Sequence, residues 1–313
     1  MKFAPRKFSI IFLLVWSYSA LGQAENIAEK LGYPKDAKML IIHADDLGMS
    51  NSENRASIEG LEMGPVNSAS IMVPCPWFPE IASYAKTHQH VDFGLHLTLN
   101  SEWKNYKWGP VSAKDSVATL VNSQGYFFDN VPEVVQKGDP DHVEIELRNQ
   151  VLKAKKEGID ITHLDAHMGA AMGSVDFLAA YIKVGREFNL PVLLDDAIPA
   201  MADTKIQEML GPKDIVMDRT MSANPTNFAN GMDVFYTSIL NELEPGLNCL
   251  LIHLAYDDVE MRAITVDHPD WGAAWRQADF DFFNSKEAKK LVEDNNIVLV
   301  TWKMLRDKIV RAD

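Results

Sequence analysis

Short apolar segments alternate with longer segments of helical periodicity from Lys38 to near the end of the chain. A continuous apolar run of about four to eight residues, bounded by turn residues, is typical of a buried strand. The predicted strands are Met39–Ala44, Ser68–Val73, Phe93–Leu99, Ile161–Ala166, Val192–Leu194, Asn248–His253 and Ile297–Thr301.

Amphipathic helices are predicted between these strands, because apolar residues recur there at intervals of three and four. The clearest example ends at Gly158, a residue that commonly terminates helices. The predicted helices are Ser52–Met63, Ile81–Lys86, Val143–Glu157, Val175–Phe188, Asp233–Leu243 and Ser285–Asp294. About seven alternations of strand and helix indicate an α/β fold with parallel strands and right-handed crossovers. A barrel and a doubly wound sheet both fit this pattern. With no internal repeat or Pro/Gly-rich linker, we expect a single domain.

The segment from Asn100 to Asp141 lacks clear periodicity. Unpatterned segments of this length within a compact domain are usually functional. We therefore expect it to contribute to a binding site.

The N-terminus has the pattern of a secretory signal peptide, predicted over residues 1–24, which leaves 25–313 as the mature domain. Lys2, Arg6 and Lys7 precede the apolar run Phe8–Trp16, and small residues suited to cleavage follow by position 24. A membrane anchor is the alternative, but the run is shorter than the ~20 residues needed to cross a bilayer. No later segment is long and apolar enough to do so. The sequence predicts an exported protein, periplasmic or secreted.

The charge and the cysteines narrow the possible functions. A formal net charge of −14 argues against nucleic acid as a partner and is compatible with a neutral or cationic substrate. The two cysteines, Cys75 and Cys249, are too few for a disulfide scaffold. They could pair after export, but their apolar surroundings favour two buried, unpaired thiols.

Histidines and aspartates gather where predicted strands end. They are His43, Asp45 and Asp46 on the first strand, His96 on the third, His163, Asp165 and His167 on the fourth, and His253 on the sixth. The carboxyl ends of parallel strands lie on one side of such folds, where ligands bind, so these side chains should converge. Strand alternation places His163, Asp165 and His167 on one face.

This set of side chains suits metal-assisted hydrolysis of an unreactive bond such as an amide. One aspartate with two histidines is a mixed oxygen and nitrogen ligand set that leaves positions for water. The cation lowers the pKa of that water towards ~7, and a neighbouring carboxylate can take its proton. Because Asp45 and Asp46 are adjacent, they should point in different directions, one to ligate and the other to accept a proton.

Each residue also has a structural alternative. Asp46 could cap the following helix, and His96 taken alone could be a hydrogen-bonded core residue. His163 could orient a ligand rather than act as one. The pair Asp195-Asp196 has no accompanying histidine, and we interpret it as a loop or a cap.

The same residues resemble a known family, the YdjC-like carbohydrate deacetylases, which include chitooligosaccharide deacetylases. The matching segments are Ile42–Ser50 (IHADDLGMS), Gly94–Leu99 (GLHLTL), Gly158 with Thr162–His167 (THLDAH), and Leu251–His253. The resemblance covers residues 38–305, nearly the whole mature chain.

The resemblance implies a distorted β/α barrel and removal of acetyl groups from N-acetylated sugars. It further implies that Asp46, His96 and His167 hold one divalent cation. Asp45 would be the catalytic base, and His253 would protonate the departing amine. The ligands permit zinc, magnesium or manganese, with two imidazoles slightly favouring zinc.

Three positions depart from the family pattern. His43 stands where the family usually has asparagine, so it could add a ligand or orient one. Met168-Gly169 follows His167 where further histidines are usual, and Leu254-Ala255 follows His253 in place of Pro-Gly. The last two changes alter the pocket mouth, so the family's substrate is less transferable than its metal site.

Aromatic and basic residues near these positions could bind substrate. Trp103 and Trp108 could stack on sugar rings or could pin their loop to the body. Arg276 could orient a carboxylate of the site, although a surface ion pair is the simpler interpretation.

Three functions remain open from the sequence: a sugar deacetylase, a metal-dependent phosphoric-ester hydrolase, and a sugar-binding protein that has lost catalysis. The phosphoesterase predicts a second cation ~3.5–4 Å from the first, and no cluster of basic residues is present to clamp phosphate. The sequence leaves the oligomeric state open.

Overall fold

The computed structural model describes residues 26–312, so the predicted signal peptide lies outside the described residues. Nine strands are assigned in this part of the chain. They are β1 (Lys38–Leu47), β2 (Ser68–Ile71), β3 (Phe93–Leu97), β4 (Ile161–Ala166), β5 (Leu194–Asp195), β6 (Val216–Met217), β7 (Arg219–Ser222), β8 (Gly246–Ile252) and β9 (Val298–Leu299).

Thirteen α-helices and four 3₁₀- or π-helical turns connect the strands within residues 26–312. The helices are α1 (Ile27–Leu31), α2 (Asn51–Met63), α3 (Phe78–Thr87), α4 (Val131–Lys137), α5 (Pro140–Glu157), α6 (Val175–Glu187), α7 (Thr204–Met209), α8 (Pro225–Asn230), α9 (Met232–Asn241), α10 (Val259–Ile264), α11 (Ala273–Phe283), α12 (Lys286–Asp294) and α13 (Trp302–Leu305). The turns are η1 (Lys114–Leu120), η2 (His167–Met172), η3 (Pro199–Ala202) and η4 (Arg306–Val310). None of the helices in residues 26–312 is both long and apolar enough to cross a membrane.

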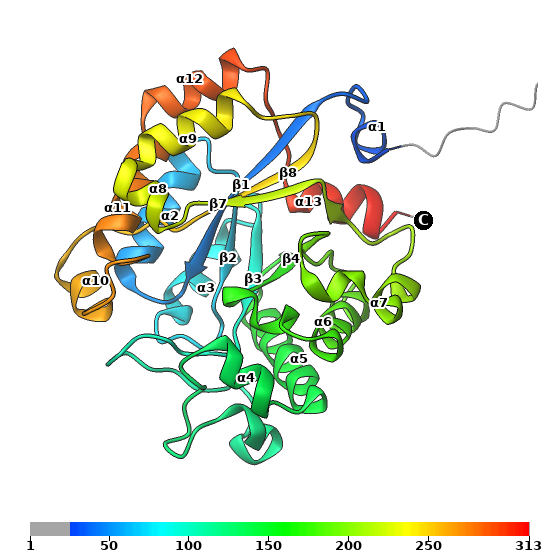
Figure 1. Ribbon diagram of the computed structural model, residues 1–313, viewed down its shortest axis with the longest axis vertical. Coiled ribbons are helices and arrows are strands. Elements are labelled where there is room, and N and C mark those ends of the chain that lie inside the picture. Colours follow the sequence, from blue (N-terminus) through cyan, green and yellow to red (C-terminus); the bar gives the residue numbers. More distant parts are fainter. Residues whose placement is uncertain (1–25, 313) are drawn as a thin grey trace, which may run out of the picture.

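Seven strands form one parallel sheet in the order β4-β3-β2-β1-β8-β7, with β9 also paired to β1. The segment before β5 lies next to β4, because Leu193 donates its amide hydrogen to the Leu164 carbonyl. The strand β5 then pairs with β6 in a separate two-stranded sheet. The helices lie around the strands, with α5 and α6 near β3 and β4 and with α9, α11 and α12 on the far side (Figure 1). The prediction of a distorted, single-domain β/α barrel is confirmed.

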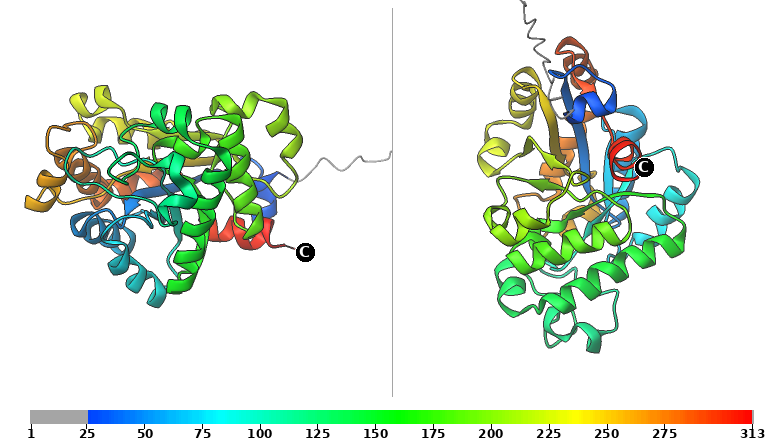
Figure 2. Two further views of the ribbon diagram at one scale, coloured as in Figure 1. Left: turned by 90° about the horizontal axis from the view of Figure 1, so that it is seen from below. Right: turned by 90° about the vertical axis from the view of Figure 1, so that its right-hand side faces the viewer.

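The interior of the barrel changes character along its axis. On β1, Met39 and Ile41 face an apolar cluster that includes Trp302, whereas His43 and Asp45, two and four residues further on, join a polar network. Strand alternation places all four on one face. Near the two ends of the described chain, α1 packs against η4, and both contribute to this apolar cluster (Figure 2). The amino end of the barrel is therefore closed by apolar packing, and its polar end is the carboxyl end.

Several predicted elements need correction. The two strands β6 and β7 were not predicted, because β6 has two residues and β7 is polar and partly exposed. Val192–Leu194 is shifted, since the strand β5 is Leu194–Asp195. The unpatterned segment from Asn100 to Asp141 contains η1, α4 and the start of α5. Cys75 and Cys249 are buried and unpaired, as expected.

Candidate metal centre

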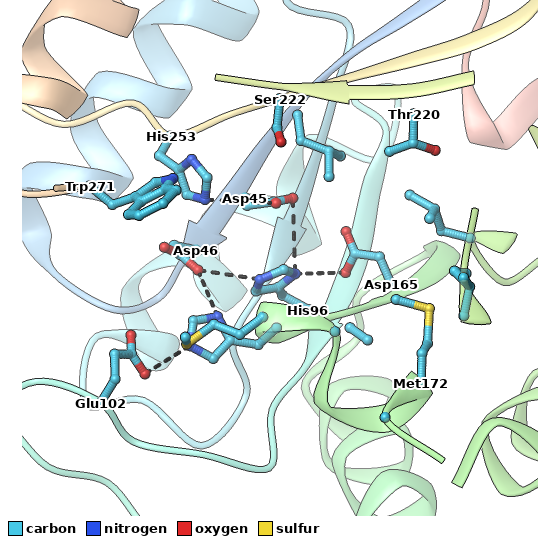
Figure 3. A pocket seen from close by; sticks show the side chains of 18 of the residues that line it. Asp45, Asp46, His96, Glu102, Asp165, Met172, Thr220, Ser222, His253 and Trp271 are labelled. Carbon is cyan, nitrogen blue, oxygen red and sulfur yellow. Dashed lines mark hydrogen bonds and ion pairs between the residues drawn. The ribbon is translucent and has the colours of Figure 1, made fainter. Parts of the chain in front are cut away.

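Three buried atoms suited to metal ligation meet at the carboxyl end of the barrel (Figure 3). Asp46 Oδ1 lies 3.3 Å from His96 Nε2 and 3.2 Å from His167 Nδ1. Despite this proximity, Asp46 Oδ1 has no hydrogen-bond partner among the described residues. A buried carboxylate oxygen without a donor is costly unless a cation or water satisfies it. The residues present therefore fit a divalent cation.

Each imidazole is oriented by a carboxylate behind it. His96 Nδ1 lies 2.9 Å from Asp165 Oδ1, and His167 Nε2 lies 3.0 Å from Glu102 Oε2. With these ring nitrogens donating to the carboxylates, the opposite nitrogens present lone pairs towards Asp46. This is how histidine ligands are usually held in metal sites. Burial opposes the charged form of His167, but Glu102 and Asp46 raise its pKa to about 9, so a cation would replace protons when it binds.

The backbone of Asp46 has an uncommon conformation that directs its side chain. Its φ of 71° lies in the left-handed region, and the register between β1 and β2 is irregular from Ala44 to Leu47. Such backbone strain in a non-glycine residue often occurs at functional sites. The alternative role as a helix cap is wrong, because Ser50 caps α2 by accepting a hydrogen bond from the Glu53 amide.

Arg276 on α11 holds the other oxygen of Asp46. Its Nη2 donates to Asp46 Oδ2 at 2.7 Å and its Nη1 donates to Glu53 Oε2 at 2.8 Å. All three side chains are buried, so the interpretation of Arg276 as a surface ion pair is wrong. Burial alone would raise the pKa of Asp46, but the Arg276 charge and the two histidines hold it well below its usual range.

Asp45 points away from Asp46, towards the centre of the polar network. Its Oδ1 lies 3.1 Å from His43 Nε2, and its Oδ2 lies 3.9 Å from His253 Nε2. His253 is held from behind by Asp279, whose Oδ2 accepts the His253 amide hydrogen at 3.0 Å. Burial lowers the pKa of His253 to about 4, so its imidazole is neutral at neutral pH. The two aspartates thus have different surroundings, as their adjacency predicted.

His43 lies below this centre rather than in it. Its Nε2 is 2.7 Å from Asp165 Oδ2, and its Nδ1 is 2.8 Å from Ser68 Oγ. Both ring nitrogens already have protein partners, and His43 does not line the cavity described below. The structure therefore brings His43 next to the carboxylate that orients His96.

His163 is one layer further from the cavity. Its Nδ1 bonds Thr162 Oγ1 at 2.9 Å, and its ring stacks on Trp302 with 4.8 Å between centroids. Gly94 makes room for it, because a Cβ at position 94 would lie 2.3 Å from the His163 ring. His163 shares the interior face with Asp165, as strand alternation predicted, but its hydrogen bond within residues 26–312 is to Thr162 and not to a candidate ligand.

The candidate residues open into one cavity of about 690 Å³. Asp45, Asp46, His96, Asp165, His167, His253, Trp103 and Arg276 all line it. Trp108 does not line it. The Trp108 indole packs edge-on behind His167 and donates its Nε1 hydrogen to the Asn100 carbonyl, so this residue pins the loop.

Sequence reasoning missed several residues of the site. Glu102, Glu53 and Trp271 were not singled out, although each contacts a predicted site residue. Trp271 lies beside His253, and its carbonyl accepts a hydrogen bond from Arg276 Nε at 2.7 Å. Glu102 could have been identified as a candidate from its position next to Trp103, in the long unpatterned segment after β3. Glu53 and Trp271 gave no comparable signal.

A parallel barrel with an Asp/His/His cluster at its carboxyl end defines a class of metal-site proteins, and sequence comparison identifies the family. The family model for YdjC-like protein matches residues 39–294, so this chain belongs to the YdjC-like family. A carbohydrate deacetylase of Thermoanaerobacter pseudethanolicus is 28% identical over 278 residues, covering 86% of this chain and 100% of the relative. A carbohydrate deacetylase of Thermus thermophilus is also 28% identical, over 295 residues, covering 91% and 99%.

A solved structure has the same fold. It is a candidate cellobiose-phosphate cleavage protein from Enterococcus faecalis, 21% identical, which superimposes with a TM-score of 0.72 over 86% of this chain and 99% of that one. This likeness supports the barrel architecture.

Proposed function

We propose that this protein is a metal-dependent hydrolase that removes acetyl groups from N-acetylated carbohydrates. The observation that carries the proposal is the convergence of Asp46, His96 and His167 on one buried point beside Asp45. The carbohydrate deacetylases of Thermoanaerobacter pseudethanolicus and Thermus thermophilus match this chain over nearly their whole length and support the same assignment.

Asp46, His96 and His167 would hold one divalent cation. Such a cation polarises the acetamide carbonyl and lowers the pKa of a water molecule bound to it. The donor set of two imidazoles and one carboxylate favours zinc, and it also permits magnesium or manganese.

Asp45 is suited to accept the proton of the attacking water. Its carboxylate lies between the ligand cluster and His253, with Oδ2 facing His253 Nε2 at 3.9 Å. His253 is neutral at neutral pH, so it can take up this proton and then donate it to the amine nitrogen. The water oxygen bonds to the acyl carbon, the C–N bond breaks, and acetate and the free amino sugar leave. A protonated His253 gives up its proton readily in this environment, because burial disfavours its charge.

Trp271 offers an aromatic face for the sugar. It lines the cavity beside His253, where the amine would depart (Figure 3). Trp103 also lines the cavity, but it is only 2% exposed and Arg276 lies over its ring. Aromatic rings bury the apolar face of a sugar while its hydroxyls bond elsewhere. Trp271 therefore replaces the pair Trp103 and Trp108 as the candidate platform, because Trp103 is buried and Trp108 lies behind His167.

The test is acetate release by the purified chain. Metal-free protein, prepared with a chelator, is assayed with N-acetylglucosamine oligomers before and after addition of zinc, magnesium or manganese. We expect acetate only with a cation. Cation binding to the wild-type chain without release of acetate from any N-acetylated sugar would overturn the proposal and leave a sugar-binding role.

The same assay with chromogenic phosphate esters tests the phosphoesterase alternative. Among the described residues that line the cavity, Arg276 is the sole arginine or lysine, and its guanidinium already bonds Asp46 and Glu53. The described lining has no lysine or second arginine that could clamp a phosphate. We therefore expect no release of phosphate.

We also propose that the chain is exported, on the basis of its N-terminal basic and apolar segments. Cell fractionation followed by N-terminal sequencing of the mature protein tests this. Cytoplasmic protein that retains Met1 to Ala24 would contradict it.

A further inference from the structure

The cavity extends well beyond the groups that acetamide hydrolysis uses. Its volume of about 690 Å³ lies in the range of pockets that enclose drug-sized ligands. Trp271 and His253 lie on one side of Asp45 and His96, and Met172 and Thr220 lie on the opposite side (Figure 3). The first side is polar and aromatic, whereas most side chains of the second side are aliphatic, with Thr220 among them.

This second side, which we name the apolar compartment, is lined by Met172, Leu193, Ile198, Pro199 and Leu251, with Asp195 and Thr220 as its polar members. The apolar members come from η2, from β8, and from the segment 193–199, which lies beside β4 through the hydrogen bond between Leu193 and Leu164. Three separate elements thus contribute apolar side chains to one wall. Methionine side chains adapt readily to apolar ligands of different shape.

The direction of the scissile amide assigns an occupant to the apolar compartment. An amide placed over the ligand cluster has its amine on one side and its acyl carbon chain on the other. The amine belongs next to His253, which would protonate it, and so the sugar lies near Trp271. The acyl chain then points to the opposite side, towards Met172. An acetyl methyl would contact only the entrance of the apolar compartment.

We propose that the apolar compartment binds the acyl chain of an N-acyl amino sugar and that this chain is several methylenes longer than acetyl. The inference rests on the proposed function, since it uses the same amide bond and the same groups, and it specifies the substrate class. Each methylene transferred from water to an apolar site favours binding by about fourfold. A hexanoyl chain, with four more methylenes than acetyl, has room for a gain of at least about tenfold even if it is only partly enclosed.

Binding is measured separately from turnover. The zinc-loaded Asp45→Asn variant of the mature chain is titrated calorimetrically with N-acetyl-, N-butanoyl-, N-hexanoyl- and N-octanoylglucosamine. We expect affinity to rise with chain length and to be at least about tenfold higher for hexanoyl than for acetyl. Equal or falling affinity along this series would overturn the inference. A rise produced equally by an alkyl glycoside of N-acetylglucosamine would also overturn it, because the chain would then occupy the apolar compartment as an aglycone.

Turnover by the wild-type chain distinguishes the two proposals. Acetate release with no advantage for the longer acyl groups leaves the proposed function intact and overturns the inference. Chain-length-dependent binding without cleavage of any amide supports the apolar compartment and overturns the proposed function.

A filling substitution tests the location. Met172→Trp should lower the ratio of kcat/KM for hexanoyl over acetyl substrate by about tenfold, mainly through KM. Met63→Trp is the matched control, since Met63 is an exposed methionine at the end of α2 and does not line the cavity. An unchanged ratio in Met172→Trp would place the chain elsewhere and overturn the assignment.

Discussion

His43 Nε2 lies 2.7 Å from Asp165 Oδ2 and 3.1 Å from Asp45 Oδ1, so one buried imidazole joins two carboxylates of the site. Asp165 orients His96, and Asp45 is the proposed base. Burial opposes the charged form of His43, but its bonds with Asp165 and Asp45 raise its pKa to about 9. His43 is therefore a cation at neutral pH. Burial alone would raise the pKa of Asp165, but His96 and His43 hold it well below its usual range.

His43→Asn should weaken cation binding and kcat/KM by ~10–100-fold, the usual effect of removing a group that orients metal ligands. The variant loses the positive charge and the bond to one carboxylate, so Asp45 and Asp165 repel each other. Competition with a chromogenic zinc chelator measures the affinity, and acetate release measures turnover. His90→Asn is the control, because His90 is exposed. Wild-type zinc affinity in His43→Asn would contradict this role.

The two adjacent aspartates should respond differently to the same substitution. Asp45→Asn removes the proposed base and should lower kcat by ~10²–10⁴-fold while zinc binding persists. Asp46→Asn weakens a ligand and should lower zinc affinity together with turnover. Parallel zinc titrations and rate assays on both variants separate the effects. Full activity in Asp45→Asn would remove Asp45 from the base role.

Arg276→Met should destabilise the fold by about 3–5 kcal/mol, because it leaves Asp46 and Glu53 buried without their common cation. Urea denaturation of the metal-free protein measures the loss. Arg262→Met is the matched control, since Arg262 pairs with Asp257 at the surface, where water and salt screen the pair and its contribution to stability is small. Similar losses in both variants would refute the buried role of Arg276.

Asp92 should make stability depend on pH. Burial raises its pKa to about 6, even though the Trp302 amide donates to its Oδ2 at 2.6 Å. Because the folded pKa exceeds the unfolded value of 3.8, the favourable contribution of Asp92 is complete below about pH 4 and is lost as pH rises through 6.

Asp92→Asn mimics the protonated carboxyl. Relative to wild type, this variant should gain about 3 kcal/mol of unfolding free energy between pH 4 and pH 8, since each pKa unit corresponds to about 1.4 kcal/mol. Urea denaturation of both proteins at the two pH values measures the gain. A difference between variant and wild type that is constant with pH would contradict the shifted pKa of Asp92.

The sequence predicted the regular strands of the structure and the residues at their ends. Apolar runs located β1, β3 and β4, and the ends of these strands located Asp45, Asp46, His96 and His167. Strand alternation correctly placed His163 and Asp165 on one face, but the distance of each from the cavity depends on packing across the barrel. Glu102 lies in an irregular segment, and Arg276 reaches Asp46 from a helix 230 residues away. No local pattern reports contacts of this kind.

The division of the barrel interior constrains how β1 can pair. Met39 and Ile41 close the amino end, and His43 and Asp45 serve the polar end from the same face of the same strand. A slip of one residue would turn all four outward and bring Leu40, Ile42 and Ala44 inward. Misregistered chains would thus lose their core packing and their chemistry together. A register error in this strand would therefore yield an unstable chain that is exposed to proteolysis, rather than a stable but inactive enzyme.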